Sequence, residues 1–341
     1  MEQITIKEIA QLCGVGVSTV SRAINNHPDI NEETRKKIMD TIQKYNYIPN
    51  NSARNLKRAA SKTIAVLVKG ISNPFFGAVI DVIEREIIHN RYTFYLQQVE
   101  EHEDEVEVAI QLEKEKRLKG IVFLGGMHQH PADRLKMLTV PSVIVTVDMK
   151  LPEDIENCGA VSIDDEAESY RMVDYLCHQG YQHIAIATPE QSDESVGSAR
   201  LEGYKRALLA NGREVDESLI LFIRRDANTY SMRKGYETAK QLLESGSKFD
   251  CLYCVADTIA VGACRAVIDA GLRIPEDVAV AGFDGTDMAR YYHPSITTVC
   301  QPREEMASRA AAMLFDMIRK RKVKEHKVLF EAQLQVGEST H

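Results

Sequence analysis

Two series of short, mostly apolar segments, separated by stretches of helical periodicity, set the strongest limit on how this 341-residue chain can fold. Such segments are typical of strands buried on both faces of a parallel sheet. The first series comprises Ile64–Val68, Tyr92–Leu96, Gly120–Leu124 and Val143–Val147, and the second comprises Ile184–Ala187, Leu219–Phe222, Cys251–Val255 and Val278–Phe283. Strands that alternate with helices predict the α/β fold class, and two series predict two similarly built lobes with a ligand cleft between them.

The segment Thr5–Asn25, by contrast, has the pattern of two short helices joined by a tight turn. The spacing of Thr5 and Glu8 predicts a capping box at the start of the first helix. Gly14 lies where the turn needs a permissive backbone. The inward apolar face is predicted to consist of Ile6, Ile9, Ala10 and Leu12, with Val15 and Val20. This is a helix-turn-helix, a shape that enters the major groove of DNA; a helical hairpin inside a larger domain is the alternative interpretation.

Two further features complete the predicted helical head. Val17, Ser18 and Arg22 fall on the outward face of the second helix, which makes them candidates to touch base edges. Asn31 is positioned to cap a third helix that runs through Lys44. The core-facing residues of that helix are predicted to be Ile38, Ile42 and Tyr45.

Charge is divided unevenly along the chain. Residues 1–62 contain ten Lys or Arg and six Asp or Glu, a net charge of +4, whereas the whole chain carries −8. A basic head on an acidic body places the nucleic-acid contact at the head and argues against a DNA-coating role for the rest.

The cysteines and the apolar runs indicate the cellular compartment in which the protein is expected. Seven cysteines, an odd number, lie at positions that mostly resemble strand or helix interiors. Because no segment resembles a signal peptide, we expect a reduced, cytoplasmic protein. Cys251 and Cys254 have the spacing of half a metal site but no second pair, so we interpret them as part of a buried strand. No apolar run is long enough to cross a bilayer, so no membrane partner is expected.

Polar and aromatic residues follow several predicted strands, where they would face the cleft. Asn73, Phe75 and Phe76 follow the first strand, and Arg200 opens the helix after the fifth. The carboxylates that follow strands are Asp148, Asp164, Asp257 and Asp284. Carboxylates and a guanidinium beside aromatic rings suit polyhydroxylated ligands such as sugars. The alternative for each Asp, taken singly, is a helix N-cap.

Motifs of catalysis are missing from the sequence. It contains no nucleophile elbow, no paired catalytic carboxylates and no phosphate loop. We therefore expect the cleft to bind and not to catalyse, with no cofactor and no metal ion.

The connection between head and body has its own pattern. Tyr47–Asn50 ends the third helix, because the residue before a proline avoids helical geometry. The run Asn51–Arg58 can form a short helix, but it has one large apolar residue among basic and polar ones. So short a helix is marginal in water because nucleation is costly, so we expect it to order on a partner.

These residues resemble the lactose-repressor (LacI/GalR) family of bacterial transcription regulators. The similar motifs follow one another in the family's order and cover essentially the whole chain. They are Thr5–Asn25, Tyr47–Asn50, Ala53 to Leu56, Ser72–Phe76, Arg200–Tyr204, Ala256–Gly262, Gly271–Val278, Gly282–Asp284 and Thr297–Pro302.

The resemblance implies a domain organisation. It implies a helix-turn-helix DNA-binding domain over residues 1–48, a hinge helix over 49–61 and an effector-binding and dimerisation domain over 62–341. The last would resemble a periplasmic sugar-binding protein, with parallel α/β sheets in two lobes. The N-terminal lobe would take about 62–163 and 302–325, and the C-terminal lobe about 164–301 and 326–341.

The resemblance also implies partners and contacts. The protein would be a repressor that binds a pseudo-palindromic operator as a dimer and is controlled by a small sugar-like effector. The residues implied to contact DNA are Thr5, Val17, Ser18, Thr19, Ser21, Arg22, Asn25 and Asn50 and, in the hinge, Ala53, Arg54, Leu56 and Lys57, with Leu56 wedged into a base step. The implied effector contacts are Asn73, Phe75, Phe76, Asp148, Asp164, Glu194, Arg200, Asp257, Asp284 and Gln301.

Some features limit what the resemblance implies. Ala256 stands where many members have a polar ligand contact, so the identity of the effector cannot be transferred. No leucine heptads follow Glu338–His341, so a dimer is expected without a tetramerisation tail.

The alternative to control by a small effector is a regulator gated by a phosphorylated carrier protein, as in the catabolite-control members. Ile80–Asn90, however, resembles an ordinary amphipathic helix without a phosphate-binding cluster.

Overall fold

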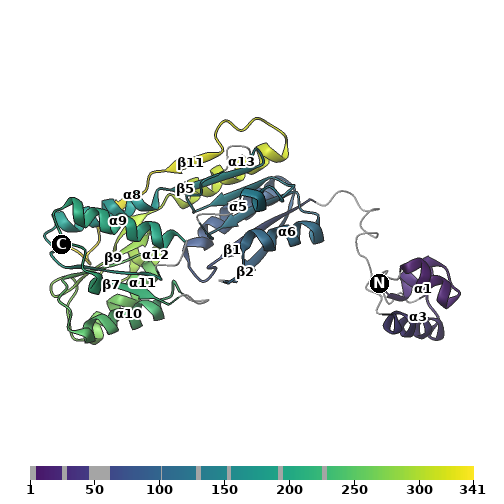
Figure 1. The fold of residues 1–341 in the computed structure, drawn as a ribbon, viewed down its shortest axis with the longest axis horizontal. Coiled ribbons are helices and arrows are strands. Elements are labelled where there is room, and N and C mark those ends of the chain that lie inside the picture. The colour runs from purple at the N-terminus through teal and green to yellow at the C-terminus, as the bar shows by residue number, and fades with distance from the viewer. Residues whose placement is uncertain are drawn as a thin grey trace. The chain divides into compact units, whose positions relative to one another are not determined.

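The computed structural model describes residues 5–24, 29–45, 62–100, 102–127, 132–151, 155–190, 195–224 and 229–341. The chain divides into two compact units, Met1–Ala60 and Ser61–His341, which we call the head and the body (Figure 1). The hinge helix expected over 49–61 lies outside the described residues.

The head consists of α1 (Ile6–Cys13), α2 (Val17–Ile24) and α3 (Glu32–Lys44). The predicted capping box is confirmed, because Thr5 Oγ1 accepts from the backbone N–H of Glu8 while the Glu8 carboxylate accepts from that of Thr5. Gly14 ends α1 with a φ of 67°, as the predicted turn requires. Asn31 Oδ1 accepts from the backbone N–H of Glu33 at 2.8 Å, so Asn31 caps α3 as predicted.

Two residues predicted to face the core of the head are exposed. Leu12 is 50% exposed and Tyr45 is 43% exposed. Cys13 is buried where Leu12 was expected, because it lies four residues after Ile9 and shares its face of α1. The buried core of the head is Ile9, Ala10, Cys13, Val20, Ala23, Ile30 and Ile38.

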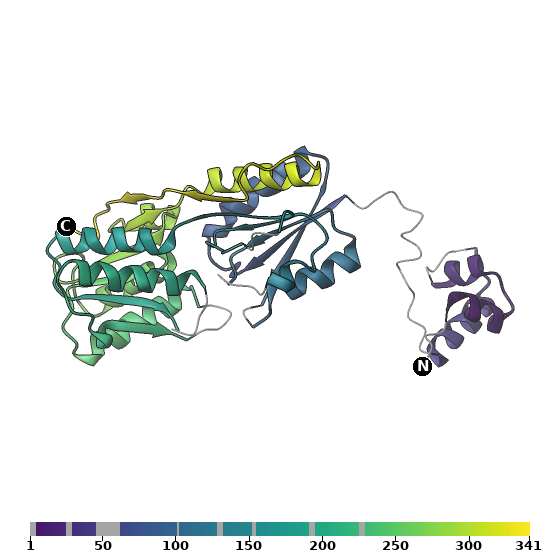
Figure 2. The same cartoon turned by 45° about the horizontal axis from the view of Figure 1, so that its top comes forward.

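The first lobe of the body contains a six-stranded sheet in the order β11-β5-β4-β3-β1-β2, with every pair parallel. Its strands are β1 (Thr63–Lys69), β2 (Thr93–Val99), β3 (Gly120–Leu124), β4 (Ser142–Val145), β5 (Cys158–Ile163) and β11 (Lys327–Phe330). Its helices are α5 (Phe75–His89), α6 (Glu105–Lys116), α7 (Ala132–Leu135) and α13 (Arg303–Ile318). Figure 2 shows α13, in yellow, above this sheet.

The second lobe repeats this architecture with strand order β12-β10-β9-β8-β6-β7, in which only the β10–β12 pair is antiparallel among the strands described. Its strands are β6 (Ile184–Pro189), β7 (Ile220–Ile223), β8 (Cys251–Cys254), β9 (Ala279–Asp284), β10 (Thr297–Cys300) and β12 (Gln333–Gln335). Its helices are α8 (Asp165–His178), α9 (Val196–Ala210), the 3-10 helix η1 (Glu217–Leu219), α10 (Met232–Ser245), α11 (Asp257–Asp269) and α12 (Asp287–Tyr291). All eight predicted strands are present, and the α/β fold class is confirmed.

The chain crosses between the lobes after β5, after β10 and after β11. The third crossing differs from the prediction, which assigned 326–341 to the C-terminal lobe. β11 pairs in parallel with β5, so Lys327–Phe330 belongs to the first lobe. Sequence reasoning missed this strand because its residues alternate between exposed and half-buried, as in an edge strand, and give no continuous apolar run.

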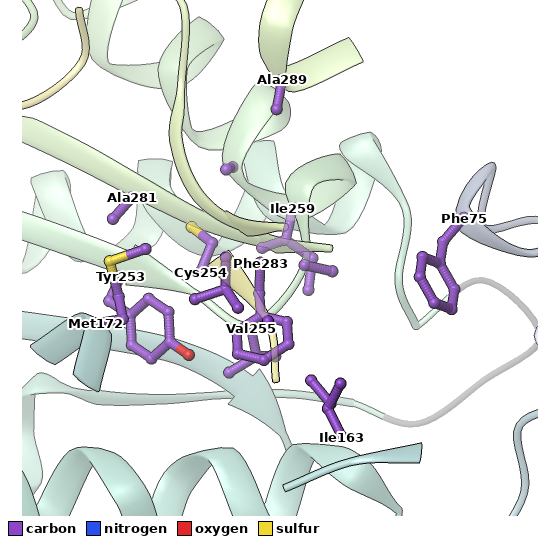
Figure 3. Close-up of a cluster of buried hydrophobic side chains, with 14 of the residues drawn as sticks. Phe75, Ile163, Met172, Tyr253, Cys254, Val255, Ile259, Ala281, Phe283 and Ala289 are labelled. Carbon is purple, nitrogen blue, oxygen red and sulfur yellow. The ribbon is translucent and has the colours of Figure 1, made fainter. Parts of the chain in front are cut away.

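The core of the second lobe depends on close backbone contact between α10 and α11. A Cβ atom added to Gly262 would lie 1.9 Å from the carbonyl oxygen of Met232, and one added to Gly235 would lie 2.1 Å from that of Ile259. Only glycine fits at such a contact. Figure 3 shows Ile259 of α11 beside Val255 and other buried side chains at the carboxyl ends of the second lobe's strands.

We predict that Gly262→Ala lowers the free energy of unfolding of the body by about 1–3 kcal/mol or more, because carbonyl oxygens cannot move aside as a flexible side chain does. Gly77→Ala is the control, because Gly77 is exposed in α5 and an added Cβ would meet no atom within 4 Å. The control should be neutral or more stable by up to about 1 kcal/mol. Urea midpoints followed by circular dichroism test this, and equal midpoints for the two variants would contradict it.

Candidate functional site

The outward face of α2 carries the three predicted base-reading residues. Val17 is 41% exposed, and Ser18 and Arg22 are also exposed. Val20 and Ala23, on the opposite face, are fully buried. The helix therefore presents one face to a partner while the other face anchors it.

The other predicted DNA contacts fall into two groups. Thr5 is exposed at the start of α1, and Thr19 and Ser21 are half-buried in α2. The remainder lie outside the described residues and are Asn25, Asn50, Ala53, Arg54, Leu56 and Lys57.

A cavity lies between the two lobes of the body, where small-molecule sites are often found. From the first lobe it is lined by Lys69, Gly70, Asn73, Phe75, Phe76, Gly125, Gly126, Thr146 and Val147. From the second lobe it is lined by Ser195, Val196, Arg200, Thr229, Tyr230, Asp284 and Gln301. The predicted effector contacts that the structure brings together here are Asn73, Phe75, Phe76, Arg200, Asp284 and Gln301.

Four predicted effector contacts are not among these lining residues. Asp164 accepts from the backbone N–H of Ala167 at 2.9 Å and caps α8, which is the alternative that the sequence left open. Asp148 is paired with Lys327 of β11. Glu194 lies outside the described residues.

Asp257, the fourth, has no exposed surface and does not line the cavity. Its carboxylate accepts from the backbone N–H and hydroxyl of Thr286, at 2.7 and 2.8 Å, and from the hydroxyl of Thr298 at 2.6 Å. These bonds tie the start of α11 to β10 and to the loop after β9. Asp257 is thus part of the structure that holds the second lobe's strand ends in place.

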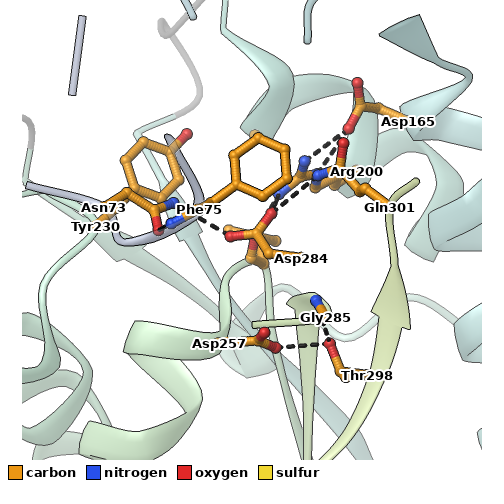
Figure 4. Close-up of polar contacts among 12 residues, drawn as sticks. Asn73, Phe75, Asp165, Arg200, Tyr230, Asp257, Asp284, Gly285, Thr298 and Gln301 are labelled. Atoms are coloured by element: carbon orange, nitrogen blue, oxygen red, sulfur yellow. Dashed lines mark hydrogen bonds and ion pairs between the residues drawn. The ribbon is translucent and has the colours of Figure 1, made fainter. Parts of the chain in front are cut away.

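Arg200 is the buried centre of the cavity's polar wall (Figure 4). Its guanidinium donates to Asp165 at 2.9 Å and to the carbonyl oxygen of Val255 at 2.6 Å. It also lies 3.6 Å from a carboxylate oxygen of Asp284. The ring of Phe283 stacks beneath it, with the guanidinium carbon 3.7 Å from the ring centroid. These contacts hold the Arg200 side chain in place without a ligand.

Asp284 connects the two lobes. Its Oδ2 accepts from Asn73 Nδ2 of the first lobe at 3.1 Å, and its Oδ1 accepts from Gln301 Nε2 at 3.0 Å. Because the amide nitrogen of Gln301 is held by Asp284, the amide oxygen is directed elsewhere. That oxygen is buried and receives no hydrogen bond from the described residues, so it is an acceptor ready for a ligand.

Two residues that line the cavity have strained backbones. Thr146, after β4, has a φ of 75°, and Asp284, the last residue of β9, has a φ of 119°. Left-handed geometry is unfavourable for residues with a Cβ, and it persists where the surrounding structure enforces it, often at binding sites. The two residues end strands in opposite lobes, so both walls of the cavity share this feature.

The cations of the cavity wall are already paired with carboxylates. Lys69 is buried at the end of β1, where it donates to Glu105 at 3.2 Å and to the carbonyl oxygen of Glu103 at 2.8 Å. Arg200 is paired with Asp165 and Asp284. Among the described residues of the wall and their partners, three carboxylates therefore face two cations.

Burial sets the protonation of the two carboxylates at the strand ends. Burial, followed by the charge of Asp284, raises the pKa of Asp257 to about 7. Burial also raises the pKa of Asp284, although Arg200, Asn73 and Gln301 oppose the rise.

Sequence reasoning missed part of the cavity wall. Lys69 was visible as a charged residue at the end of an otherwise apolar strand, a position that faces the cleft in a parallel sheet. Tyr230 and Thr146 gave no such signal, because the first comes from a long connection and the second belongs to an apolar run. Cys251 and Cys254 lie in β8 with no exposed surface, which confirms that they belong to a buried strand.

The fold and the cavity define a class of protein, a two-lobed ligand-binding body joined to a helix-turn-helix head. Within the described ranges, no helix is both long and apolar enough to cross a membrane. Residues 5–50 match the model of bacterial regulatory proteins of the lacI family, and residues 173–340 match that of a periplasmic binding protein-like domain.

Comparison with known proteins places the chain in a family. The HTH-type transcriptional regulator MalR of Clostridium butyricum is 41% identical over 92% of both chains. Catabolite control protein A of Priestia megaterium is 28% identical over 99% of both. The protein belongs to the lacI family of bacterial regulatory proteins and is a DNA-binding transcriptional regulator.

Solved structures agree with this fold. A complex of the transcriptional regulator CelR with cellobiose covers 99% of this chain and 100% of its own, at 27% identity and a TM-score of 0.71. The lac repressor dimer bound to operator and the anti-inducer ONPF has a TM-score of 0.69 over 99% of both chains, at 22% identity.

We predict that the body loses stability as the pH rises from about 4 to about 7, because folded Asp257 retains a proton that the unfolded chain releases near its ordinary pKa of about 3.9. In Asp257→Asn there is no charge to bury, and the hydroxyls of Thr286 and Thr298 can still bond to the amide. Its urea midpoint should therefore change less between about pH 5 and pH 8 than that of the parent.

Asp277→Asn is the control for this pH dependence. Asp277 is exposed, and hydrogen bonds from Arg273 lower its pKa to about 2, so it stays ionised throughout the window. The control should follow the parent. A parental pH dependence that persists in Asp257→Asn would show that another group causes it.

Proposed function

We propose that the protein represses transcription by binding a pseudo-palindromic operator as a dimer, and that a neutral sugar in the cavity changes its affinity for that operator. The observation that carries the proposal is the set of buried acceptors around Arg200, where residues of both lobes meet. A ligand bound there contacts both lobes at once, so its binding energy depends on their relative orientation.

The polarity of the wall supports a ligand rich in hydroxyl groups. The Asp284 carboxylate and the free Gln301 amide oxygen are acceptors, and a sugar supplies O–H donors to both. Phe75 and Phe76, whose ring centroids lie 5.5 Å apart, and Tyr230 supply apolar surface for the C–H face of a sugar ring.

The charge balance of the wall supports a neutral ligand over an acidic or phosphorylated one. A phosphate or carboxylate group is usually held by cations in excess. Here Lys69 is held by Glu105, and Arg200 is held by Asp165 and Asp284, so an anion would meet more negative than positive charge. The cellobiose bound by the regulator CelR is a neutral disaccharide, in agreement with this choice.

The DNA side of the proposal rests on α2. Arg22 supplies the strongest base contact, because a guanidinium can donate two hydrogen bonds to guanine. Val17 and Ser18 supply small apolar and hydroxyl contacts, and Thr5, Thr19, Ser21, Asn25 and Asn50 remain proposed backbone or groove contacts. In the hinge, Leu56 is proposed to wedge into the central base step, beside Ala53, Arg54 and Lys57.

The first test concerns operator recognition. Arg22→Ala should reduce the preference for the protein's own promoter region over random duplex DNA by about 1–3 kcal/mol, because it removes a base-specific contact. Lys36→Ala, on the exposed side of α3, is the control and should change binding to both DNAs by the same factor. Competition binding at fixed salt measures both preferences. If the unaltered protein shows no preference for its promoter, the proposed function is wrong.

The second test concerns the effector. A neutral sugar at about one hundred times its dissociation constant should stabilise the body by about 2.7 kcal/mol, which thermal shift detects in a panel of sugars, sugar acids and sugar phosphates. Gln301→Ala should weaken the sugar about 3- to 10-fold, because one hydrogen bond is lost. Asp148→Asn, outside the cavity wall, is the control and should bind like the parent. Tighter binding of a sugar phosphate than of the parent sugar would contradict the choice of a neutral ligand.

A further inference from the structure

The two lobes of the body end their long helices differently. Each of the seven helices of twelve or more residues in the described body is followed, at or just after its end, by a residue with a positive φ. In the second lobe these residues are Gly180, Gly212, Gly246 and Gly271. In the first lobe they are Arg91, Arg117 and Lys320. Glycine is the favoured residue in this left-handed conformation, so the first lobe departs from the rule with a basic residue each time.

The same contrast holds for the surrounding charge. It is seen in the connections that lead from these helices to the next strand, each taken from the last helical turn. In the first lobe the connections are 86–92, 113–119 and 315–326, and they contain ten Lys or Arg and five Asp or Glu. In the second lobe they are 175–183, 207–219, 242–250 and 266–278, and they contain three Lys or Arg and eight Asp or Glu.

Stabilisation of helix ends does not explain this difference. Cations at a helix C-terminus interact favourably with the helix dipole, and both lobes have helices of similar length ending in the same way. The second lobe meets the same requirement with glycines and an acidic surface. The basic residues of the first lobe therefore need an explanation other than the stabilisation of helix ends.

These connections form one continuous surface, which we call the basic end: segments 86–92, 113–119 and 315–326 together with Lys62. In a parallel sheet, the connections from helix to strand all lie at the amino ends of the strands. Backbone hydrogen bonds join Lys62 to Thr93 and Thr63 to Lys119, each at 2.8 Å, and Arg319 donates to the side chain of Asn90. Figure 2 shows that α13, in yellow, runs toward the end of the first lobe that lies away from the second.

The basic end is also where the chain enters the body from the head. Lys62, the residue that precedes β1, is exposed and belongs to it. The exposed cations on this surface are Lys62, Arg91, Lys114, Lys116, Arg117, Lys119, Arg319, Lys320, Arg321, Lys322 and Lys324. They stand on a body that is otherwise acidic, since residues 63–341 carry a net charge of −12.

We propose that the basic end is a second DNA-binding surface, which contacts the phosphate backbone flanking the operator. The proposal rests on the operator-binding function proposed above and adds to it, because it assigns part of the DNA affinity to the body. Duplex DNA is the partner that the position favours, since the head, which binds DNA, is joined to the body at this surface. Contacts of this kind read no sequence but add affinity that falls steeply with salt.

The test compares two triple variants of the full-length protein that have the same net charge. In one, Lys119→Gln, Lys322→Gln and Lys324→Gln remove three exposed cations of the basic end. In the other, Arg224→Gln, Lys240→Gln and Lys248→Gln neutralise three exposed cations of the second lobe. Because all six side chains are exposed, both variants should fold, which thermal melts check.

Binding to promoter duplexes is measured across a salt series, once with the minimal footprint and once with about ten flanking base pairs on each side, about one helical turn. Because each substitution occurs in both subunits of the dimer, we expect the basic-end variant to lose up to about five units from the slope of log affinity against log salt. It should also lose the gain that flanking DNA gives the parent. The second-lobe variant should match the parent in both respects.

The outcomes separate this inference from the proposed function. If the parent does not prefer its promoter, the operator function itself fails. If the parent binds but the two triple variants have equal slopes, the basic end does not contact DNA. If the basic-end variant keeps the parental slope but loses binding to a phosphorylated carrier protein, the surface docks an acidic protein and the assignment to DNA is overturned.

Discussion

The burial of the Arg200 guanidinium is the constraint on which the binding region depends. A buried cation is tolerated only when carboxylates and carbonyl oxygens surround it, and removal of one partner leaves an uncompensated charge. Here the partners are Asp165 at the start of α8, Asp284 at the end of β9 and the carbonyl oxygen of Val255 after β8. Their positions fix the strand ends of the second lobe, and the same Asp284 then accepts from Asn73 across the cavity. The buried Arg200 guanidinium therefore accounts both for the contact between the lobes and for the acceptors that a ligand would meet.

The first lobe has a distinct role at each end of its sheet. At the carboxyl ends of its strands, Lys69 and Thr146 complete the cavity wall. At the amino ends, the chain continues toward the head and the basic end gathers its cations. A change of lobe orientation at the cavity would thus move the surface that we assign to flanking DNA, together with the attachment point of the head. The equivalent surface of the second lobe is acidic, so we assign no DNA contact to it.

Sequence patterns predicted the repeated elements well and the polar site in part. The eight apolar runs predicted strands because burial on both faces leaves a continuous signal, whereas the edge strand β11 left none and shifted one lobe boundary. Asp164 and Asp257 show why the sequence predicts the site only in part. Both follow strands as cleft residues do, but one caps α8 and the other accepts from two threonines that are distant in sequence. Tertiary packing sets such partners, and the spacing of residues along the chain does not reveal them.

We expect a neutral sugar in the cavity and DNA at the head to act on one equilibrium. The most direct measurement is the affinity for the promoter duplex, by fluorescence anisotropy at fixed salt, with and without a saturating neutral sugar that stabilises the body. We expect the sugar to change the DNA affinity by about 5-fold or more. Bound DNA should change the sugar's affinity by the same factor, because coupling between sites is reciprocal. An unchanged DNA affinity with the cavity filled would contradict it.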